Sequence, residues 1–433
     1  MCRRGTPPRQ DEERLRLNPF RALRPAPALA AQVAAVPYDV VNRDEAAALA
    51  AGNPHSFLHV GRSDIDLPPD TDPHDDRVYA AARDALERFQ RDGTLIREPA
   101  PCFYLYRQVM GGRAQTGLVG CVHIDDYERD VIRKHEKTRK DKEDDRTRHV
   151  LELGANAEPV FLTYRARPEL DRLADPVTRE APLYDFTAPD GVRHVVWRIE
   201  DTRPWAELFG TVPVAYVADG HHRSASAWRA GRELQRANPA HHGNEEYNWF
   251  LAVLFPDGQL RILPYNRVVR DLAGQSPARV LERLREAGTV RPADSPEPPR
   301  AGTVCVYLDG SWHLLEFDPA RIDAGHPIRS LDVSLLHELV LGPVLGIGDV
   351  RTDERIDFVG GIRGAEALER RVDSGAAAIA FSMFPTTLDQ LMAVSDAGEV
   401  MPPKSTWFEP KLRSGLFVHT LDQPPEDGGR APA

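Results

Sequence analysis

The segment 212–234, VPVAYVADGHHRSASAWRAGREL, constrains the fold more than any other part of the chain. Its apolar start, 212–217, predicts a buried strand, and the residues after Gly220 follow the spacing of a helix. A strand that turns at once through a glycine into a helix is typical of α/β folds. The free N–H groups and the dipole at the start of such a helix form a site for an anion.

Five consecutive residues at this turn carry the chemistry: Asp219, Gly220, His221, His222 and Arg223. The glycine lets a ligand approach the backbone closely, and the two histidines and the arginine add hydrogen-bond donors. The aspartate could fix a histidine tautomer or hold a metal. A capped helix with surface histidines is the alternative interpretation. We predict that this DGHHR turn binds a phosphate-bearing ligand.

Strand and helix patterns are mixed through most of the chain, which predicts a mixed α/β (α+β) class. Apolar runs predict strands over 101–109, 115–124, 193–199, 212–217, 249–255, 260–269, 303–308, 312–317, 355–359 and 377–384. Helical periodicity predicts helices over 43–51, 76–92, 221–236, 277–287, 332–341, 364–374 and 386–397. Asn42 and either Thr386 or Thr387 are expected N-caps.

Proline-rich and polar stretches suggest where the parts of the chain divide. The segment 291–302 predicts a linker or loop between a core at 16–290 and a C-terminal α/β portion at 303–421. The polar ends, 1–15 and 422–433, are expected to be disordered.

Composition narrows the function classes. A formal net charge of −11 repels a nucleic-acid backbone and makes nucleic acid an improbable partner. The four cysteines are far apart and form no CxxC pair, so we expect buried thiols rather than disulfides or a zinc site: Cys2, Cys102, Cys121 and Cys305. No apolar segment follows the basic residues near the N-terminus, and no stretch approaches the length of a membrane span, so we expect a cytoplasmic location and no membrane partner.

A second signal lies in 131–161, where His135 and Glu136 precede a dense alternation of charges. Most of these charges suit a solvated helix face, with a pair such as Glu136 and Lys140. Three basic residues could instead line a phosphate pocket: Arg139, Arg146 and, more weakly, Lys142. A zinc-protease HExxH motif is excluded because its second histidine would stand at position 139.

Two further segments carry candidate side chains. Lys404, Ser405 and Thr406 lie between prolines in 401–417 and either reach into a site or belong to a C-terminal strap. Asp39 closes an apolar run and either binds substrate or metal, or forms a structural turn. No P-loop, dinucleotide fingerprint, protein-kinase motif set or G-x-S-x-G elbow is present, so a nucleotide would be bound by another device.

These segments, in consistent order from about residue 15 to 420, resemble the family labelled domain of unknown function 1015. The resemblance is carried by VPYDVV, NPHSFLHV, KHEKTRKDKEDDR, NAEPVFL, ADGHHR, LPYNRVV and MPPKSTWF followed by PK and SGL. The DGHHR turn is also similar to that of the ParB/sulfiredoxin-like superfamily, which implies such a core within 16–290, with an N-terminal extension and an insertion. Sulfiredoxin activity is not expected because the turn has no cysteine.

Free-serine kinases of that superfamily hold nucleotide phosphates with this turn and use a glutamate of an upstream His-Glu motif as general base. The resemblance implies catalytic roles for three residues: Glu136, His135 and Asp219. Phosphate binding would fall to Gly220, His221, His222, Arg223, Lys404, Arg139 and Arg146. Substrate binding would fall to Asp39, Ser405 and Thr406.

The expected function is nucleotide-dependent phosphorylation of a small hydroxylated metabolite, with free L-serine as the first candidate. ATP or ADP would be the donor, with Mg²⁺ bridging its phosphates and no separate protein metal site. Three alternatives remain: a ParB-type nucleotide-dependent DNA-binding protein, a nucleotide-sensing module without turnover, and a metal hydrolase built on His135, His221 and His222.

Overall fold

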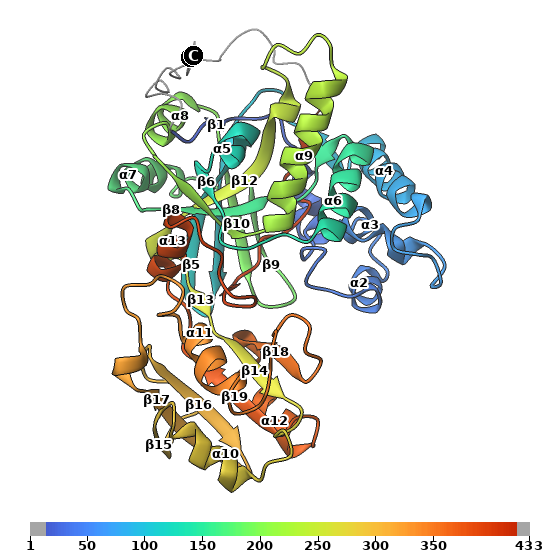
Figure 1. The fold of residues 1–433 in the computed structure, drawn as a ribbon. Coiled ribbons are helices and arrows are strands. Elements are labelled where there is room, and N and C mark those ends of the chain that lie inside the picture. The colour runs from blue at the N-terminus through green and yellow to red at the C-terminus, as the bar shows by residue number, and fades with distance from the viewer. Residues whose placement is uncertain (1–13, 422–433) are drawn as a thin grey trace, which may run out of the picture. The chain divides into compact units, whose positions relative to one another are not determined.

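A computed structural model describes residues 14–421, which form two compact units (Figure 1). Unit 2 is Leu260–Glu409, and unit 1 contains the described residues on either side of it. The chain therefore leaves unit 1 after Gln259 and returns to it at Pro410.

The compact units divide the chain at positions other than the predicted boundary at 291–302. That segment is a loop within unit 2, between β15 (Gly288–Pro292) and β16 (Thr303–Leu308). The reason is that β14 (Tyr265–Val269), placed by the sequence in the core, pairs with two strands of the unit 2 sheet.

Unit 1 is built on a sheet in which nine described strands take part, with most neighbours antiparallel. Its order is β6 (Ile132–Arg133), β11 (Ala215–Asp219), β8 (Val160–Tyr164), β12 (Trp249–Pro256), β5 (Arg113–His123), β4 (Phe103–Met110), β10 (Arg193–Ile199) and β9 (Tyr184–Thr187), and β1 (Leu17–Asn18) pairs with β5. The pairs β6–β11 and β8–β12 are parallel. The centre of the sheet is buried, since every residue of β8 is buried.

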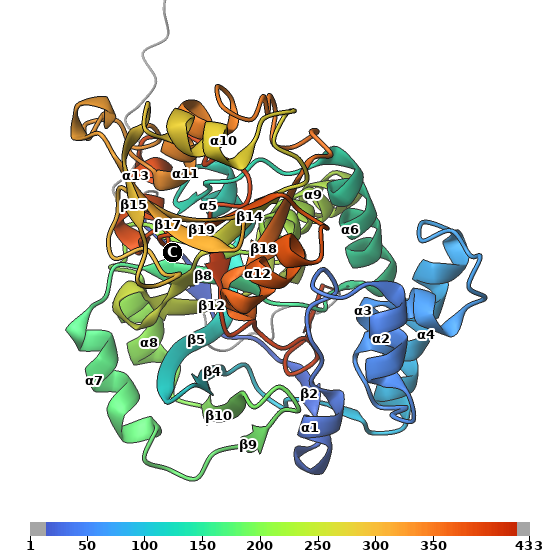
Figure 2. The ribbon, with the colours of Figure 1, turned by 90° about the horizontal axis from the view of Figure 1, so that it is seen from below.

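Helix α9 (His221–Ala237) packs on β8 and β12, and α6 (Lys140–Leu153) lies beside it (Figure 2). The small residues of the buried face of α9 allow this close approach: Ala225, Ala227, Ala230 and Gly231. The remaining helices of unit 1 are α1 (Ala30–Val33), α2 (Arg43–Ala50), α3 (Leu58–Gly61), α4 (Asp76–Arg91), α5 (Ile124–Glu128), α7 (Pro168–Val177) and α8 (Arg203–Phe209). Two short pairs, β2 (Leu23–Pro25) with β3 (Leu95–Arg97) and β7 (Ala155–Asn156) with β21 (His419–Thr420), complete the unit.

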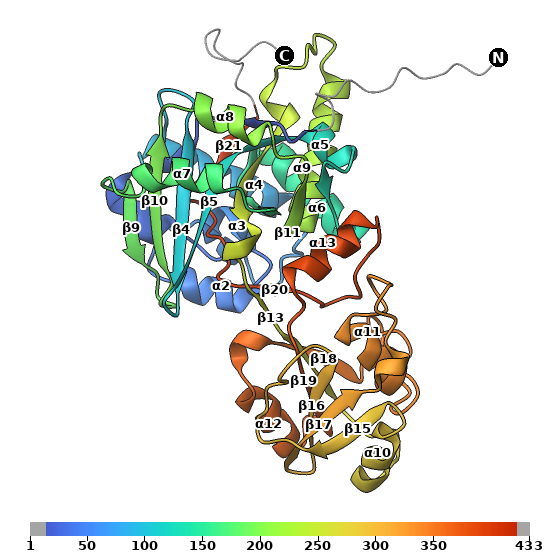
Figure 3. The same ribbon diagram turned by 90° about the vertical axis from the view of Figure 1, so that its left-hand side faces the viewer.

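Unit 2 has an antiparallel sheet (Figure 3). Its order is β15, β17 (Ser311–Phe317), β16, β19 (Ile379–Met383), β14 and β18 (Ile356–Gly360). Its helices are α10 (Pro277–Leu284), α11 (Asp332–Leu336), a π-helical turn (His337–Leu341), α12 (Glu366–Asp373) and α13 (Leu388–Asp396). Leu368 of α12 is buried in an apolar cluster with Val268 and Tyr307 of the sheet. Short strands β13 (Ile262–Leu263) and β20 (Trp407–Phe408) pair separately.

The predicted mixed α/β class is confirmed, and the predicted strands and helices match observed ones with boundaries shifted by a few residues. Asn42 and Thr387 are N-caps, each in a capping box. The expected pair of Glu136 with Lys140 is wrong, because α6 begins only at Lys140, which pairs with Asp144 instead.

The three cysteines of the described residues, Cys102, Cys121 and Cys305, are buried free thiols, as expected. Burial raises the pKa of Cys102 and of Cys305 to about 11.

Within residues 14–421, no helix is long and apolar enough to cross a membrane. Cys2 and most of the two ends predicted to be disordered lie outside the described residues, although Leu15 is described and buried.

The packing of α9 predicts the effect of Gly231→Ala. A Cβ at this position would overlap the backbone carbonyl oxygen of Tyr247 and lie 2.9 Å from Cδ1 of Ile124. We expect a loss of about 1–3 kcal/mol in the free energy of unfolding, although helix propensity alone favours alanine by about 1 kcal/mol. Urea denaturation measures the change, and Glu233→Ala on the exposed face of the same helix is the near-neutral control. A stabilised Gly231→Ala variant would contradict this packing.

Candidate functional site

The DGHHR turn joins β11 to α9 through Gly220, whose φ is +90°. This left-handed conformation strongly favours glycine. The Arg223 guanidinium also occupies the space beside Gly220, because a Cβ at this position would lie 3.0 Å from Nε and Cζ of Arg223. The turn is thus a cradle in which the backbone and a guanidinium lie in direct contact.

Arg223 supports the turn from the buried side, with 8% of the residue exposed. Its Nη2 donates to Asp219 Oδ2 over 2.9 Å, and its Nη1 donates to the carbonyl oxygen of Pro159. Its Nε has no hydrogen-bond partner among the described residues. The predicted phosphate-binding arginine is therefore held as a fixed part of the turn.

Asp219 has a second cationic partner that the sequence did not suggest. Lys411 donates from Nζ to Asp219 Oδ1 over 3.2 Å. Burial raises the pKa of Asp219, but the charges of Lys411 and Arg223 outweigh this and lower the pKa to about 2. The carboxylate is ionised at neutral pH. Lys411 belongs to the PK pair of the last resemblance motif, which was its one signal in the sequence.

His135 and His221 form a buried, perpendicular pair with ring centroids 4.5 Å apart. Burial lowers the pKa of His135 to about 4, and it lowers the pKa of His221 well below its usual value. Both rings are therefore neutral at neutral pH. Both ring nitrogens of His135 and Nε2 of His221 lack partners within residues 14–421.

Glu136 is brought next to this pair. Its Oε2 lies 3.5 Å from Nδ1 of His221, and 49% of its side chain is exposed. This carboxylate is half-exposed and lies beside the DGHHR turn. The structure thus brings together the His-Glu pair and the DGHHR turn, which are more than 80 residues apart in the sequence.

His222 links the turn to the start of α6. The backbone N–H of Arg139 donates to His222 Nε2 over 3.2 Å, so this nitrogen is the unprotonated one. Burial lowers the pKa of His222. The guanidinium of Arg139 pairs with Asp141 at 2.8 Å and is largely exposed.

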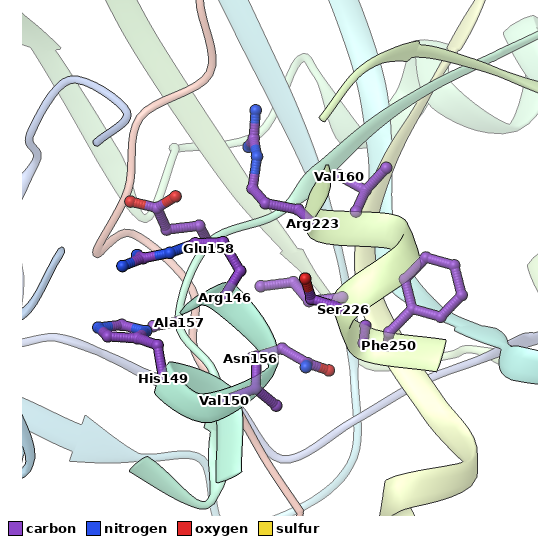
Figure 4. A pocket seen from close by; sticks show the side chains of 12 residues that line it. Arg146, His149, Val150, Asn156, Ala157, Glu158, Val160, Arg223, Ser226 and Phe250 are labelled. Carbon is purple, nitrogen blue, oxygen red and sulfur yellow. The ribbon is translucent and has the colours of Figure 1, made fainter. Parts of the chain in front are cut away.

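A small cavity of about 30 Å³, lined by both charged and apolar side chains, includes Arg223 in its wall (Figure 4). Glu158, Arg146 and Arg223 line one side of it. Ser414 donates to Glu158 Oε1 over 3.0 Å, and burial raises the pKa of Glu158. The volume holds one or two water molecules and no nucleotide. Glu158 was not predicted, although it stands in the NAEPVFL motif.

Arg146, which was predicted to bind phosphate, has its guanidinium engaged by other side chains. Its Nε donates to Asp145 over 2.8 Å and its guanidinium lies over the ring of Tyr38, 4.3 Å from the centroid. Asp39 is exposed. Burial lowers the pKa of Arg223, and the negative charge of Asp39 raises it. Burial raises the pKa of Glu158, and the charge of Asp39 raises it further. Asp39 therefore faces the same charged cluster.

Lys404, Ser405 and Thr406 lie in unit 2. Lys404 has a φ of +57°, and its Nζ lies 5.5 Å from the ring centroid of Tyr265. The hydroxyl of Ser405 donates to the carbonyl oxygen of Pro402 over 2.6 Å. Their assignment to a nucleotide or substrate site stays a prediction. Within residues 14–421, no group of three or more His, Cys, Asp or Glu side chains is placed to hold a metal ion.

The cradle predicts that Gly220→Ala will both destabilise the chain and weaken phosphate binding. A left-handed alanine costs about 1–2 kcal/mol, and its methyl group would push on the Arg223 guanidinium. Thermal or urea unfolding gives the first effect, and calorimetric titration with inorganic pyrophosphate gives the second. Gly154→Ala is the control for backbone strain alone, because Gly154 also has a positive φ but a Cβ there meets nothing within 4 Å. Equal pyrophosphate affinities in the two variants would contradict the cradle.

The lowered pKa of Asp219 predicts a pH-dependent contribution to stability. Its folded pKa of about 2 lies below the value of about 3.9 in an unfolded chain, so the unfolded state binds more protons in this interval. Stability is therefore present above pH 4 and lost as the pH falls toward 2. We expect the difference in unfolding free energy between wild type and Asp219→Asn to be constant from pH 7 to 5 and to shrink by about 2 kcal/mol toward pH 2. A difference that stays flat would show that the carboxylate is not stabilised by its cations.

Residues 17–334 match the family model described as Protein of unknown function (DUF1015), and because this is more than half of the chain, the chain belongs to that family. The predicted membership is confirmed. Comparison with curated proteins gives no match.

Several solved structures show distant similarity. A free serine kinase in complex with AMP is 13% identical, covering 69% of this chain and 90% of that chain, with a TM-score of 0.34. A conserved hypothetical protein from Pyrococcus furiosus is 14% identical, covering 70% and 95%, with a TM-score of 0.33. SbnI with C-terminal truncation from Staphylococcus aureus is 12% identical, covering 71% and 90%, with a TM-score of 0.38. TM-scores this low carry no weight for activity, which has to be argued from the site.

Proposed function

We propose that this family member binds a nucleotide by its phosphates at the DGHHR turn and transfers a phosphoryl group to a small hydroxylated metabolite, with free L-serine as the first acceptor. The observation that carries the proposal is the position of Glu136 beside the turn, 3.5 Å from His221. An anion site and a carboxylate base lie side by side, as phosphoryl transfer to a hydroxyl group requires.

The phosphate site is the N-terminus of α9. The first N–H groups of a helix have no acceptor within the helix, and the dipole there is positive. The left-handed Gly220 removes the side chain that would cover these groups. Arg223 adds a positive charge behind these groups and is held there by Asp219 and Pro159. The donor set fits a phosphate.

Glu136 takes the proton in this proposal. As the acceptor's hydroxyl oxygen forms its bond to phosphorus and the bond to the donor's leaving oxygen breaks, the hydroxyl proton passes to the Glu136 carboxylate. His221 lies on one side of this carboxylate, and its neutral ring adds no charge that would weaken the base. His135 fixes the ring of His221 by edge-to-face packing and acts as a positioning residue.

ATP or ADP is the proposed donor, and a bound Mg²⁺ would supply positive charge that stabilises the phosphates. Among the described residues, the exposed carboxylate of Asp39 is the group we propose for such an ion, which takes few protein ligands beside phosphates. We assign substrate contacts to Asp39 because it faces the same cluster as Arg223.

The test is production of O-phosphoserine by the purified full-length chain with Mg²⁺, L-serine and either ATP or ADP. We expect Glu136→Gln to lower the rate by about 100-fold or more and to leave nucleotide affinity within about twofold, because the base contacts the acceptor and not the phosphates. Glu233→Gln, on the exposed face of α9, is the control with normal activity.

Other outcomes point elsewhere. Nucleotide binding without any product from a panel of small hydroxylated acceptors would replace the kinase by a nucleotide-sensing module. Salt-dependent binding of duplex DNA would favour a ParB-like protein, against the net charge of −11. Equal rates for wild type and Glu136→Gln would remove Glu136 as the base.

A further inference from the structure

Lys411 lies on residues 410–421, which we call the C-terminal strap and which return the chain to unit 1 after unit 2. Its side chain is 14% exposed, and its Nζ lies 3.2 Å from Asp219 Oδ1. The aspartate and the lysine are separated by 192 residues in the sequence. The strap thus delivers an ammonium group to the residue immediately before Gly220.

The backbone of the strap is held on both sides of this lysine. Gln108 Nε2 donates to the carbonyl oxygen of Lys411 over 2.8 Å. Ser414 exchanges two backbone hydrogen bonds with Ala35, at 2.9 and 3.1 Å. The hydroxyl of Ser414 also reaches Glu158, so the strap passes beside the carboxylate labelled in Figure 4. These hydrogen bonds fix the strap backbone on both sides of the Lys411 side chain.

The two cations paired with Asp219 differ in the conformational freedom of their side chains. Arg223 is planar, lies against Gly220 and divides its donors between Asp219 and Pro159, so it cannot turn outward without breaking the turn. An ammonium on a flexible stem has three rotatable donors and can contact Asp219 and a phosphate oxygen together. If Lys411 shifts toward a phosphate, Asp219 still keeps Arg223 as its partner.

We propose that Lys411 binds a phosphate group of a nucleoside di- or triphosphate at the DGHHR turn and that Asp219 positions it. This inference rests on the part of the proposed function that places a nucleotide's phosphates at α9. It assigns the strap, which nothing in the turn's own sequence reveals, to the phosphate site. The contact is electrostatic, so the contribution of Lys411 grows with the number of phosphates on the ligand.

The test compares wild type, Lys411→Met and Lys411→Arg by calorimetric titration with adenosine, AMP, ADP and ATP. We expect Lys411→Met to weaken ADP and ATP binding by about 10- to 100-fold and to change adenosine affinity by less than about twofold, because adenosine carries no phosphate. Lys411→Arg keeps the charge and should restore most of the ADP affinity. Lys134→Met is the matched control, since Lys134 is a lysine of unit 1 that pairs with Asp130 at 2.7 Å.

A measurement on the wild-type chain covers the case in which Lys411→Met does not fold. ADP, but not adenosine, should protect Lys411 from acetylation, as read by mass spectrometry. Lack of protection by bound ADP, or a Lys411→Met variant that loses ADP and adenosine affinity equally, would overturn the inference and leave Lys411 as a structural counter-ion.

The two proposals fail in distinguishable ways. A wild-type chain that binds no nucleotide overturns both. A chain that binds ADP through Lys411 but phosphorylates no acceptor overturns the kinase and supports the role of Lys411. A chain that makes O-phosphoserine with unchanged ADP affinity in Lys411→Met supports the kinase and overturns the role of Lys411.

Discussion

The ion pair of Asp219 with Arg223, closed over Gly220, is the interaction on which the site depends. A buried guanidinium is costly unless its charge is paired, and here one carboxylate and one backbone carbonyl accept hydrogen bonds from its two terminal nitrogens. The left-handed glycine is what allows the arginine to fold back beneath its own helix terminus. These contacts therefore hold the start of α9 in place.

The positive charges around this turn do not come from its histidines. His135, His221 and His222 all have lowered pKa values because burial disfavours their charged forms. The positive charge at the site comes instead from arginine and lysine, which stay protonated across the physiological range. The positive charge beside the turn is then almost independent of pH above the range in which Asp219 titrates.

The sequence could predict the turn because its determinants are local. A strand, a glycine and a helix in immediate succession specify their own geometry, and Gly220 through Arg223 lie where that pattern places them. Strand β8 was not predicted, since a five-residue apolar run after a proline is too short to assign by periodicity. Glu158 and Lys411 were not predicted either, because each is placed at the site by a hydrogen bond to a residue more than 190 positions away in the sequence.

This mixture of local and distant determinants has a consequence for how the site forms. The turn needs only β11, α9 and the neighbouring Pro159, whereas the second cation on Asp219 comes from a segment that follows all of unit 2. Contacts between residues so far apart carry a larger entropic cost of loop closure and are expected to form late. An intermediate in which the strap has not yet docked would have the shape of the phosphate cradle but a carboxylate with only one positive partner. The return of the chain at Pro410 therefore brings the second positive partner of Asp219 from a part of the sequence far from the turn.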